Sequence, residues 1–264
     1  MKIIVITGST RGIGHGLAKA FLARDCAVTI SGRSLTSVEA AVEALVEEHY
    51  DPQHILGQPC DVTDIDQVQA LWDAAYTHFG KIDIWINNAG IANPQADFWQ
   101  HPPERLRAVV ETNLLGVMHG AKVALPRMIE QGAGQLYNME GLGSDGRRVA
   151  GMTLYGTTKY GVRYLTDGLV KETRDTPVVV GALSPGMVIT DLITKQYEGR
   201  PAEEWQQARR IFNILADRVE TVTPWMAEQI LANDQHGARI SWLTPTKIAW
   251  RFLTAPFRQR DLFA

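Results

Sequence analysis

The chain has 264 residues, of which 45% are hydrophobic and 21% are charged, a composition that excludes a disordered protein and a polytopic membrane protein. The 26 basic and 29 acidic residues leave a net charge of −3, so the overall charge does not favour a nucleic-acid partner. The two cysteines, Cys26 and Cys60, are expected to be small apolar core residues in a reducing compartment.

The chain opens directly with the β-branched run 2–7, and no signal-peptide pattern stands in front of that run. No segment reaches about 18 consecutive apolar residues, the length of a membrane-spanning helix. We therefore expect a cytoplasmic protein without a signal or transit peptide.

Short β-branched runs alternate with longer amphipathic stretches, which is the pattern of βαβ units. The predicted strands are 2–7, 27–31, 55–60, 83–87, 135–138 and 178–183, with an edge strand at 239–243. The predicted helices are 13–24, 35–49, 65–79, 103–131 and 153–174. Right-handed crossovers then predict an α/β fold with one doubly wound parallel sheet, a Rossmann fold.

No linker-like segment divides the chain, so a single domain is expected over 1–264. Within it, we expect a cofactor-binding and catalytic body at 1–190 and a helical, substrate-binding C-terminal region at 191–264.

A glycine-rich segment, Thr7-Gly8-Ser9-Thr10-Arg11-Gly12-Ile13-Gly14, joins the first predicted strand to the first helix. Its three glycines allow a tight turn and a close approach of the backbone to a pyrophosphate at the positive end of the helix. The spacing differs from G-x-G-x-x-G, so the position between strand and helix is what indicates a dinucleotide site.

The end of the second predicted strand distinguishes NAD from NADP. An NAD site has a carboxylate there, whereas this chain has Ser31-Gly32-Arg33-Ser34. A guanidinium pairs with phosphate oxygens, and Arg11 adds a second cation. NADP(H) is therefore the predicted cofactor; the alternative is that Arg33 is a solvated loop residue.

Three further loops follow predicted strands at the edge where open α/β sheets bind ligands. They are Asp61-Val62, expected at the adenine, Asn87-Asn88-Ala89-Gly90, and Ser184-Pro185-Gly186-Met187-Val188-Ile189-Thr190. Each of the three is a weak signal by itself.

Tyr155 and Lys159 lie four residues apart on a predicted helix, so their side chains share one face. A nearby cation lowers the pKa of a phenol, which suits proton transfer to a carbonyl oxygen during hydride transfer. The Y-x-x-x-K pattern is common, so the pair gains meaning only from the other motifs.

Five motifs occur in order: T-G-x-x-x-G-I-G at 7–14, N-N-A-G at 87–90, N-L-L-G at 113–116, Y-x-x-x-K at 155–159 and P-G-M-V-x-T at 185–190. Together they resemble the short-chain dehydrogenase/reductase family over residues 1–190. The resemblance implies that Tyr155 is the general acid, that Lys159 binds the nicotinamide ribose and lowers the pKa of the tyrosine, and that Asn113 holds a water of a proton relay.

The same resemblance implies which residues contact the cofactor and how chains associate. The dinucleotide would contact Ser9, Thr10, Ile13, Asn88, Ala89 and Gly90, and its carboxamide would contact Val188 and Thr190. A homodimer or homotetramer would form through the helices around 103–131 and 153–174.

One position departs from the family pattern. Most members have a serine 13 residues before the tyrosine, where this chain has Leu142, and the nearest hydroxyl is that of Ser144. We expect the glycine-rich loop to deliver Ser144 to the same place, because a hydroxyl can donate to a developing oxyanion whereas an ionised Glu140 only accepts. Alternatively, the site works without this serine and Glu140 has another role, or loop amides simply satisfy Glu140.

Three segments of the chain look like the chlorophyll(ide) b reductase branch of the family. They are N-M-E-G-L-G-S-D-G at 138–146, which contains the position that departs from the family pattern, I-F-N-I-L at 211–215 and W-L-T-P at 242–245. The resemblance implies reduction of the 7-formyl group of chlorophyll b or chlorophyllide b, with a tetrapyrrole as substrate. Two alternatives stay open: another bulky carbonyl or alcohol as the substrate, or a non-catalytic NADP(H)-binding sensor or scaffold. No metal site is expected.

The last 30 residues combine basic and aromatic side chains. The basic residues are Arg239, Lys247, Arg251, Arg258 and Arg260, against one acid, Asp261, and the aromatic residues are Trp242, Trp250, Phe252, Phe257 and Phe263. One interpretation is peripheral contact with a membrane surface or an acidic pigment-bearing partner. The other, which we favour, is a helix packed on the domain with its cations in solvent.

Overall fold

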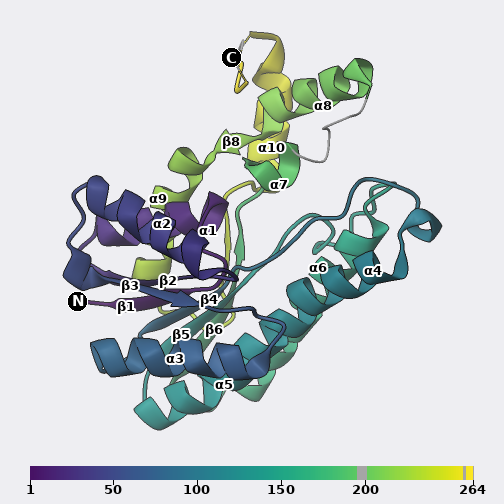
Figure 1. Cartoon of the computed structure of the whole chain (residues 1–264). Coiled ribbons are helices and arrows are strands. Elements are labelled where there is room, and N and C mark those ends of the chain that lie inside the picture. Colours follow the sequence, from purple (N-terminus) through teal and green to yellow (C-terminus); the bar gives the residue numbers. More distant parts are fainter. Residues whose placement is uncertain (195–200, 258–259, 264) are drawn as a thin grey trace.

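The computed structural model describes residues 1–194, 201–257 and 260–263. Seven strands form one parallel sheet in the order β3-β2-β1-β4-β5-β6-β9 (Figure 1). The strands are β1 (Ile3–Ile6), β2 (Ala27–Gly32), β3 (Ile55–Pro59), β4 (Ile84–Asn87), β5 (Gly134–Met139), β6 (Val178–Ser184) and β9 (Arg239–Ser241). The predicted doubly wound sheet is confirmed, and the strand order reverses between β1 and β4, the place where such sheets bind ligands.

Helices cover both faces of the sheet (Figure 1). One face carries α1 (Gly12–Leu22), α2 (Leu35–Glu47) and α9 (Val219–Ala232), and the other carries α3 (Ile65–Phe79), α5 (Gly116–Gln131) and α6 (Thr153–Glu172). Every residue of β1 and β4 is buried, because a parallel sheet is covered on both faces. This explains why these strands are short continuous apolar runs.

The helix predicted over 103–131 is confirmed at both ends, but one turn inside it is π-helical rather than α-helical. α4 (Pro103–Val110) leads into a π-helical turn, η3 (Glu111–Leu115), and α5 follows. The N–H group of Gly116 donates to the carbonyl of Glu111, which widens one turn, and this turn contains Asn113. π-Helical turns of this kind are frequent at functional sites.

The C-terminal region is divided between the sheet and a lobe above the carboxyl ends of the strands (Figure 1). α9 packs on α1, where a Cβ at Gly16 would overlap Val219, and β9 extends the sheet. The lobe contains α7 (Asp191–Thr194), α8 (Ala202–Leu215), α10 (Pro245–Thr254) and η5 (Ala255–Phe257). A small parallel pair, β7 (Val188–Ile189) with β8 (Asp217–Arg218), connects lobe and body.

Neither the small strand pair nor helices α8 and α9 were predicted individually, whereas α10 lies in the tail for which a packed helix was favoured. Among the described helices, none combines the length and apolar character needed to cross a bilayer. Cys26 and Cys60 are both buried and free of a disulfide, as expected.

Candidate active site

The glycine-rich loop between β1 and α1 is shaped by close contact with the loop after β4. Gly8 has a φ of +63°, and a Cβ there would lie 2.8 Å from the Cα of Ala89. A Cβ at Gly14 would lie 2.5 Å from Nδ2 of Asn88. Glycine is therefore required at both positions for the two loops to meet, in addition to the predicted approach of a pyrophosphate.

Polar side chains hold this loop in place. Oγ1 of Thr7 accepts from the N–H groups of Asn88 and Ala89, both at 3.0 Å, and Nδ2 of Asn88 donates to the carbonyls of Thr7 and Gly8. The buried Ser9 donates to the carbonyl of Ile6 at 2.7 Å. The side chains of Ser9 and Asn88 thus shape the loop, and the amides at the start of α1 are the groups that a phosphate would meet.

Both predicted phosphate-binding arginines have exposed side chains, and Arg11 lies within the glycine-rich loop. Arg33 directly follows β2, where a Cβ at Gly32 would lie 2.6 Å from the Thr10 methyl carbon, so this turn contacts the loop. Nη1 of Arg11 lies 3.8 Å from Oδ2 of Asp191.

The loop after β3 is held by its own aspartate. Oδ1 of Asp61 accepts from the N–H and hydroxyl of Thr63, at 3.0 Å and 2.9 Å. Val62 is buried, and a Cβ at Gly116 would lie 2.6 Å from a Val62 methyl carbon. This loop therefore packs against the start of α5.

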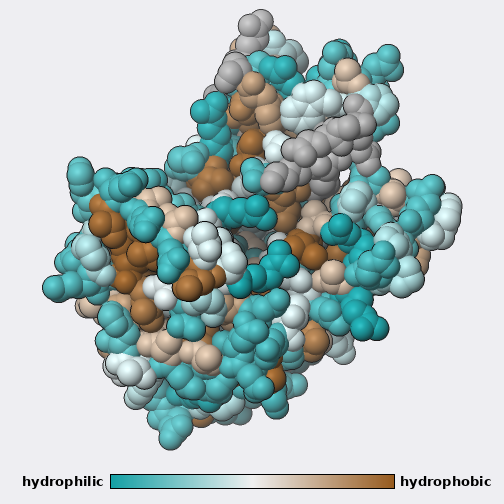
Figure 2. Space-filling view, in the orientation of Figure 1, coloured by the Kyte–Doolittle hydropathy of each residue, from teal (hydrophilic) through white to brown (hydrophobic). Residues whose placement is uncertain are grey.

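The loop after β6 reaches back to the glycine-rich loop. Pro185 is buried, Gly186 has a φ of +73°, and Val188 is buried in β7. A Cβ at Gly12 would lie 3.6 Å from the methyl carbon of Thr190. The structure therefore brings the predicted cofactor-binding loops to one edge of the sheet, where Figure 2 shows a hollow near the centre of this face.

Tyr155 and Lys159 lie on the first turns of α6. Nζ of Lys159 lies 5.7 Å from the centroid of the Tyr155 ring and donates to the carbonyl of Met139 at 3.0 Å. Burial lowers the pKa of Lys159 to about 8, whereas the charge of Glu140 raises it.

The pKa of Tyr155 differs from the expectation. Burial raises it to about 12, opposite to the lowering expected from Lys159. The ammonium faces the ring and a backbone carbonyl, and the loss of hydration on burial is the cause of the raised pKa of the hydroxyl. At neutral pH the phenol keeps its proton, which is the state of a proton donor.

Gly90 connects the cofactor edge to the catalytic helix. A Cβ at Gly90 would lie 3.3 Å from Oδ1 of Asn113 and 3.8 Å from Nζ of Lys159. The Asn113 carboxamide accepts from the N–H of Ile91 at 2.8 Å and donates to the Ile91 carbonyl at 2.9 Å and to Thr158 at 3.3 Å. The side chain of Asn113 therefore holds the main chain at Ile91 in place and does not point into the hollow.

The hydroxyl of Ser144, expected near the substrate carbonyl, points toward Glu140 in the structure. Ser144 is buried, and its hydroxyl donates to Oε2 of Glu140 at 3.5 Å. Gly141 is the residue opposite the tyrosine, since a Cβ there would lie 2.6 Å from the hydroxyl oxygen of Tyr155. Delivery of Ser144 to the carbonyl therefore stays a prediction.

Two positioning contacts were missed from the sequence. Oδ1 of the buried Asn93 accepts from the N–H of Tyr155 at 3.0 Å and so caps α6. The buried carboxylate of Glu140 accepts from Nε of Arg239 at 3.0 Å. Both pairs are far apart in the chain, so no local pattern signals either of them.

The basic residues of the tail are largely paired within the chain. The carboxylate of Asp217 accepts from Arg251 at 2.6 Å and from Arg260 at 2.8 Å, and Nζ of Lys247 lies 3.0 Å from the ring centroid of Trp242. The interpretation that these cations are simply solvated is wrong for the paired ones, and Arg258 lies outside the described residues.

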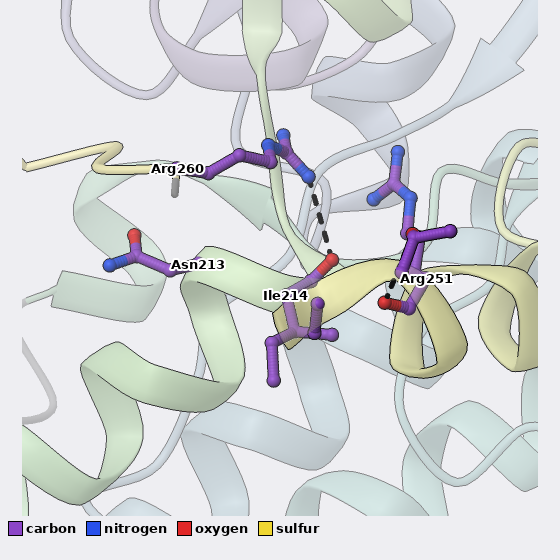
Figure 3. Close-up of a pocket in the computed structure, with 6 residues that line it drawn as sticks. Asn213, Ile214, Arg251 and Arg260 are labelled. Carbon is purple, nitrogen blue, oxygen red and sulfur yellow. Dashed lines mark hydrogen bonds between the residues drawn. The ribbon is translucent and has the colours of Figure 1, made fainter. Parts of the chain in front are cut away.

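A cavity of about 130 Å³ lies beside these arginines (Figure 3). It is lined by Asn213, Ile214, Arg251, Thr254, Ala255 and Arg260. The other side of α10 and η5 is apolar and open, with Trp250, Leu253 and Phe257 exposed at 56%, 70% and 89%.

A doubly wound sheet with a glycine-rich loop at its switch point, beside a Tyr–Lys pair on one helix, is the arrangement of a dinucleotide-dependent oxidoreductase. The family model described as short chain dehydrogenase matches residues 2–201. The chain therefore belongs to the short-chain dehydrogenase/reductase family.

Curated relatives of the chain are named as chlorophyll(ide) b reductase or probable chlorophyll(ide) b reductase. The chain is 39% identical over 256 residues to chlorophyll(ide) b reductase NOL of Arabidopsis thaliana, covering 95% of this chain and 70% of that protein. It is 33% identical over 275 residues to probable chlorophyll(ide) b reductase NYC1 of Oryza sativa subsp. japonica, covering 98% of this chain and 53% of that protein. The expected resemblance to this branch is confirmed.

Two solved structures share the fold of this chain. Levodione reductase superposes with a TM-score of 0.83 at 25% identity, covering 94% of this chain and 98% of that one. ElxO, solved with NADP bound, gives a TM-score of 0.78 at 26% identity, covering 91% of this chain and 96% of that one.

Proposed function

We propose that the chain is an NADPH-dependent reductase of the 7-formyl group of chlorophyll b or chlorophyllide b, giving the 7-hydroxymethyl product. The observation that carries the proposal is the position of Lys159. Its Nζ lies 3.8 Å from where a Cβ at Gly90 would be, in the loop that meets the glycine-rich loop, and 5.7 Å from the centroid of the Tyr155 ring. The similarity to chlorophyll(ide) b reductases over 95% of the chain supports the substrate.

The residues at the sheet edge fit NADP(H). The close loop contacts at Gly8 and Gly14 leave no room for larger side chains beside the start of α1, and Arg33 and Arg11 suit a 2′-phosphate. Asp61 would lie at the adenine, and Val188 and Thr190 at the carboxamide. The structural relative ElxO binds NADP, which supports the same cofactor here. The bound cofactor supplies the hydride.

The chain's own residues would manage the proton. Tyr155 holds a proton at neutral pH because burial raises its pKa to about 12, and it would donate this proton to the oxygen as negative charge develops there. Lys159 would orient the ribose. The carboxamide of Asn113 is engaged with Ile91, so we assign the relay water to the main-chain carbonyl of Asn113 in the π-helical turn.

The group that polarises the formyl oxygen is proposed to be the hydroxyl of Ser144, after rotation away from Glu140. Removing such a donor costs about 10²–10³-fold in kcat. We expect Ser144→Ala to lose activity on this scale, and an activity close to wild type would instead favour a site that works without this hydroxyl.

Anaerobic turnover of chlorophyll b or chlorophyllide b with NADPH, followed by absorbance and product chromatography, tests the main proposal. Wild type should form the hydroxymethyl product, and Tyr155→Phe should lose at least about 10²-fold of the rate while still binding NADPH. An inactive wild type, or an unchanged rate in the variant, contradicts the proposal. Turnover of other carbonyls alone would support the broader reductase, and NADPH binding without any turnover would support a sensor.

We also propose association of copies through α5 and α6. An apolar groove of about 320 Å³ lies between these helices, lined by Met118, Ala121, Lys122, Leu125, Pro126, Leu165 and Leu169. Light scattering after size exclusion should give the mass of a dimer or tetramer, and a monomer at micromolar concentration would contradict this.

Peripheral membrane contact through the tail is proposed to be hydrophobic rather than electrostatic, because Arg251 and Arg260 are bound to Asp217. Leu253→Ser and Phe257→Ser should reduce co-sedimentation with liposomes. Failure of the wild-type chain to co-sediment would contradict membrane contact. The cytoplasmic location stays a prediction.

A further inference from the structure

The carboxylate of Glu140 is buried near Tyr155 and Lys159. The proposed reaction assigns this carboxylate no role. Its side chain is 2% exposed, and Oε1 accepts from Nε of Arg239 at 3.0 Å. Its Oε2 accepts from the hydroxyl of Ser144 at 3.5 Å. A carboxylate in such a position is costly unless cations and hydrogen bonds compensate it.

Glu140 lies between two residues whose backbones contact the catalytic side chains. The carbonyl of Met139 accepts from Nζ of Lys159 at 3.0 Å, and a Cβ at Gly141 would lie 2.6 Å from the hydroxyl oxygen of Tyr155. Any displacement of Glu140 would therefore move both contacts.

The charges around Glu140 come from two elements. β9 contributes Arg239, which also binds Oδ1 of Asp167 at 3.1 Å. α6 contributes Lys159, which is buried, and Asp167, which is 54% exposed and lies 4.0 Å from Arg163. Arg239 is therefore ion-paired with the buried carboxylate, Lys159 interacts with the same charge without a direct ion pair, and Asp167 compensates Arg239 from the solvent side.

We propose that Glu140 is a positioning residue that keeps Lys159 in its ammonium form and, anchored by Arg239, holds residues 139–144 against Tyr155. The proposal rests on the proposed function, in which Tyr155 and Lys159 reduce a carbonyl. The direction of the effect follows from electrostatics, since the charge of Glu140 raises the pKa of Lys159 against the lowering by burial.

Glu140→Gln tests this with little change of shape, because the amide oxygen can still accept from Arg239. Without the carboxylate, Lys159 should lose its proton at lower pH, and the basic limb of the pH profile of kcat/KM should move in the same direction. We expect a loss of about tenfold at pH 9 and of less than about twofold at pH 6.5, at saturating NADPH. Glu140→Asp keeps the charge and should retain the wild-type limb.

Asp167→Asn is the matched control. Asp167→Asn removes the exposed carboxylate that binds Arg239 and leaves the buried charge of Glu140 in place. Any effect of a weakened Arg239 anchor should therefore occur in this variant too, without the loss of the buried charge. The basic limb should keep its wild-type position. An equal shift in Asp167→Asn and Glu140→Gln would overturn the proposal.

A second measurement does not depend on activity. In protein labelled with ¹³C at lysine Cε, the resonance absent from Lys159→Arg reports the titration of Lys159. It should titrate at lower pH in Glu140→Gln than in wild type. An unchanged titration overturns the proposal and leaves Glu140 a structural residue, whereas wild type that reduces no carbonyl contradicts the proposed function and leaves this test intact.

Discussion

The ammonium group of Lys159 is buried, and the loss of its hydration lowers the free energy of unfolding. Its pKa is lowered to about 8, whereas an unfolded lysine has a pKa of about 10.4. Between these values the unfolded chain binds the proton and the folded chain does not, so this contribution to stability rises with pH through that window and is most unfavourable below pH 8.

Lys159→Met should therefore raise the melting temperature at pH 7 by about 2–5 °C while abolishing turnover. The gain should shrink as the pH approaches about 10.4, where the unfolded lysine also becomes neutral. Thermal denaturation at several pH values measures this, with Lys171→Met, an exposed position on the same helix, as the control. A lower melting temperature at pH 7 would show that the bond to Met139 outweighs the cost of the charge.

Arg33 is the residue on which cofactor choice should depend. Arg33→Asp replaces the cation at the end of β2 by the carboxylate of an NAD site, so the ratio of kcat/KM for NADPH over NADH should fall about 10- to 100-fold. Steady-state kinetics with both cofactors measure the ratio. The same charge reversal at the exposed Arg174 should leave it unchanged, and an unchanged ratio in Arg33→Asp would place the 2′-phosphate elsewhere.

At the scale of elements, the start of α6 depends on a cap from a distant loop. Asn93→Ala removes the acceptor for the N–H of Tyr155 and the donor to the carbonyl of Gly151. We expect a loss of about 1–3 kcal/mol in the free energy of unfolding, and a fall in kcat larger than any change in NADPH affinity, because the cap holds the turn that carries Tyr155.

Asp64→Ala is the control for this prediction. Asp64 caps α3 by accepting from the N–H groups of Asp66 and Gln67, and its loss should cost about 1 kcal/mol without a change in kcat. Chemical denaturation and kinetics distinguish the two variants. Equal kcat values in Asn93→Ala and Asp64→Ala would show that Asn93 does not position Tyr155.

The boundaries of several elements could be predicted from sequence. The helix at 65–79 agrees with α3 at both ends, because Asp64 and Gly80 are a local cap and a local stop. The π-helical turn inside 103–131 could not be predicted, since the backbone and side-chain partners of Asn113 belong to the loop at Ile91 and to α6. Apolar periodicity is the same on either side of such a turn.

At the scale of the whole molecule, Asp217 joins the tail to the body. Its carboxylate binds Arg251, Arg260 and the indole of Trp242, the last at 2.6 Å. Its N–H donates to the carbonyl of Met187 at 3.0 Å, beside the segment proposed to bind the carboxamide. Figure 3 shows Arg251 and Arg260 around the adjacent cavity.

Asp217→Asn should reduce the free energy of unfolding by about 3–5 kcal/mol, because it leaves two partly buried guanidinium groups without their counter-ion. Glu48→Gln breaks an exposed ion pair with Lys19 and should cost at most about 1 kcal/mol. Urea denaturation of both variants tests this. A small loss in Asp217→Asn would mean that solvent reaches the arginines.

The sequence by itself determined the alternation of strands and helices, the order of the five motifs and the placement of Tyr155 and Lys159 on one helix face, because these depend on neighbours in the chain. Only the tertiary structure decided that Ser144 turns to Glu140, that the tail arginines bind Asp217 and that burial, rather than Lys159, controls the pKa of Tyr155. Burial and ion pairing depend on residues far apart in the chain, which meet only when the sheet and its C-terminal lobe have assembled.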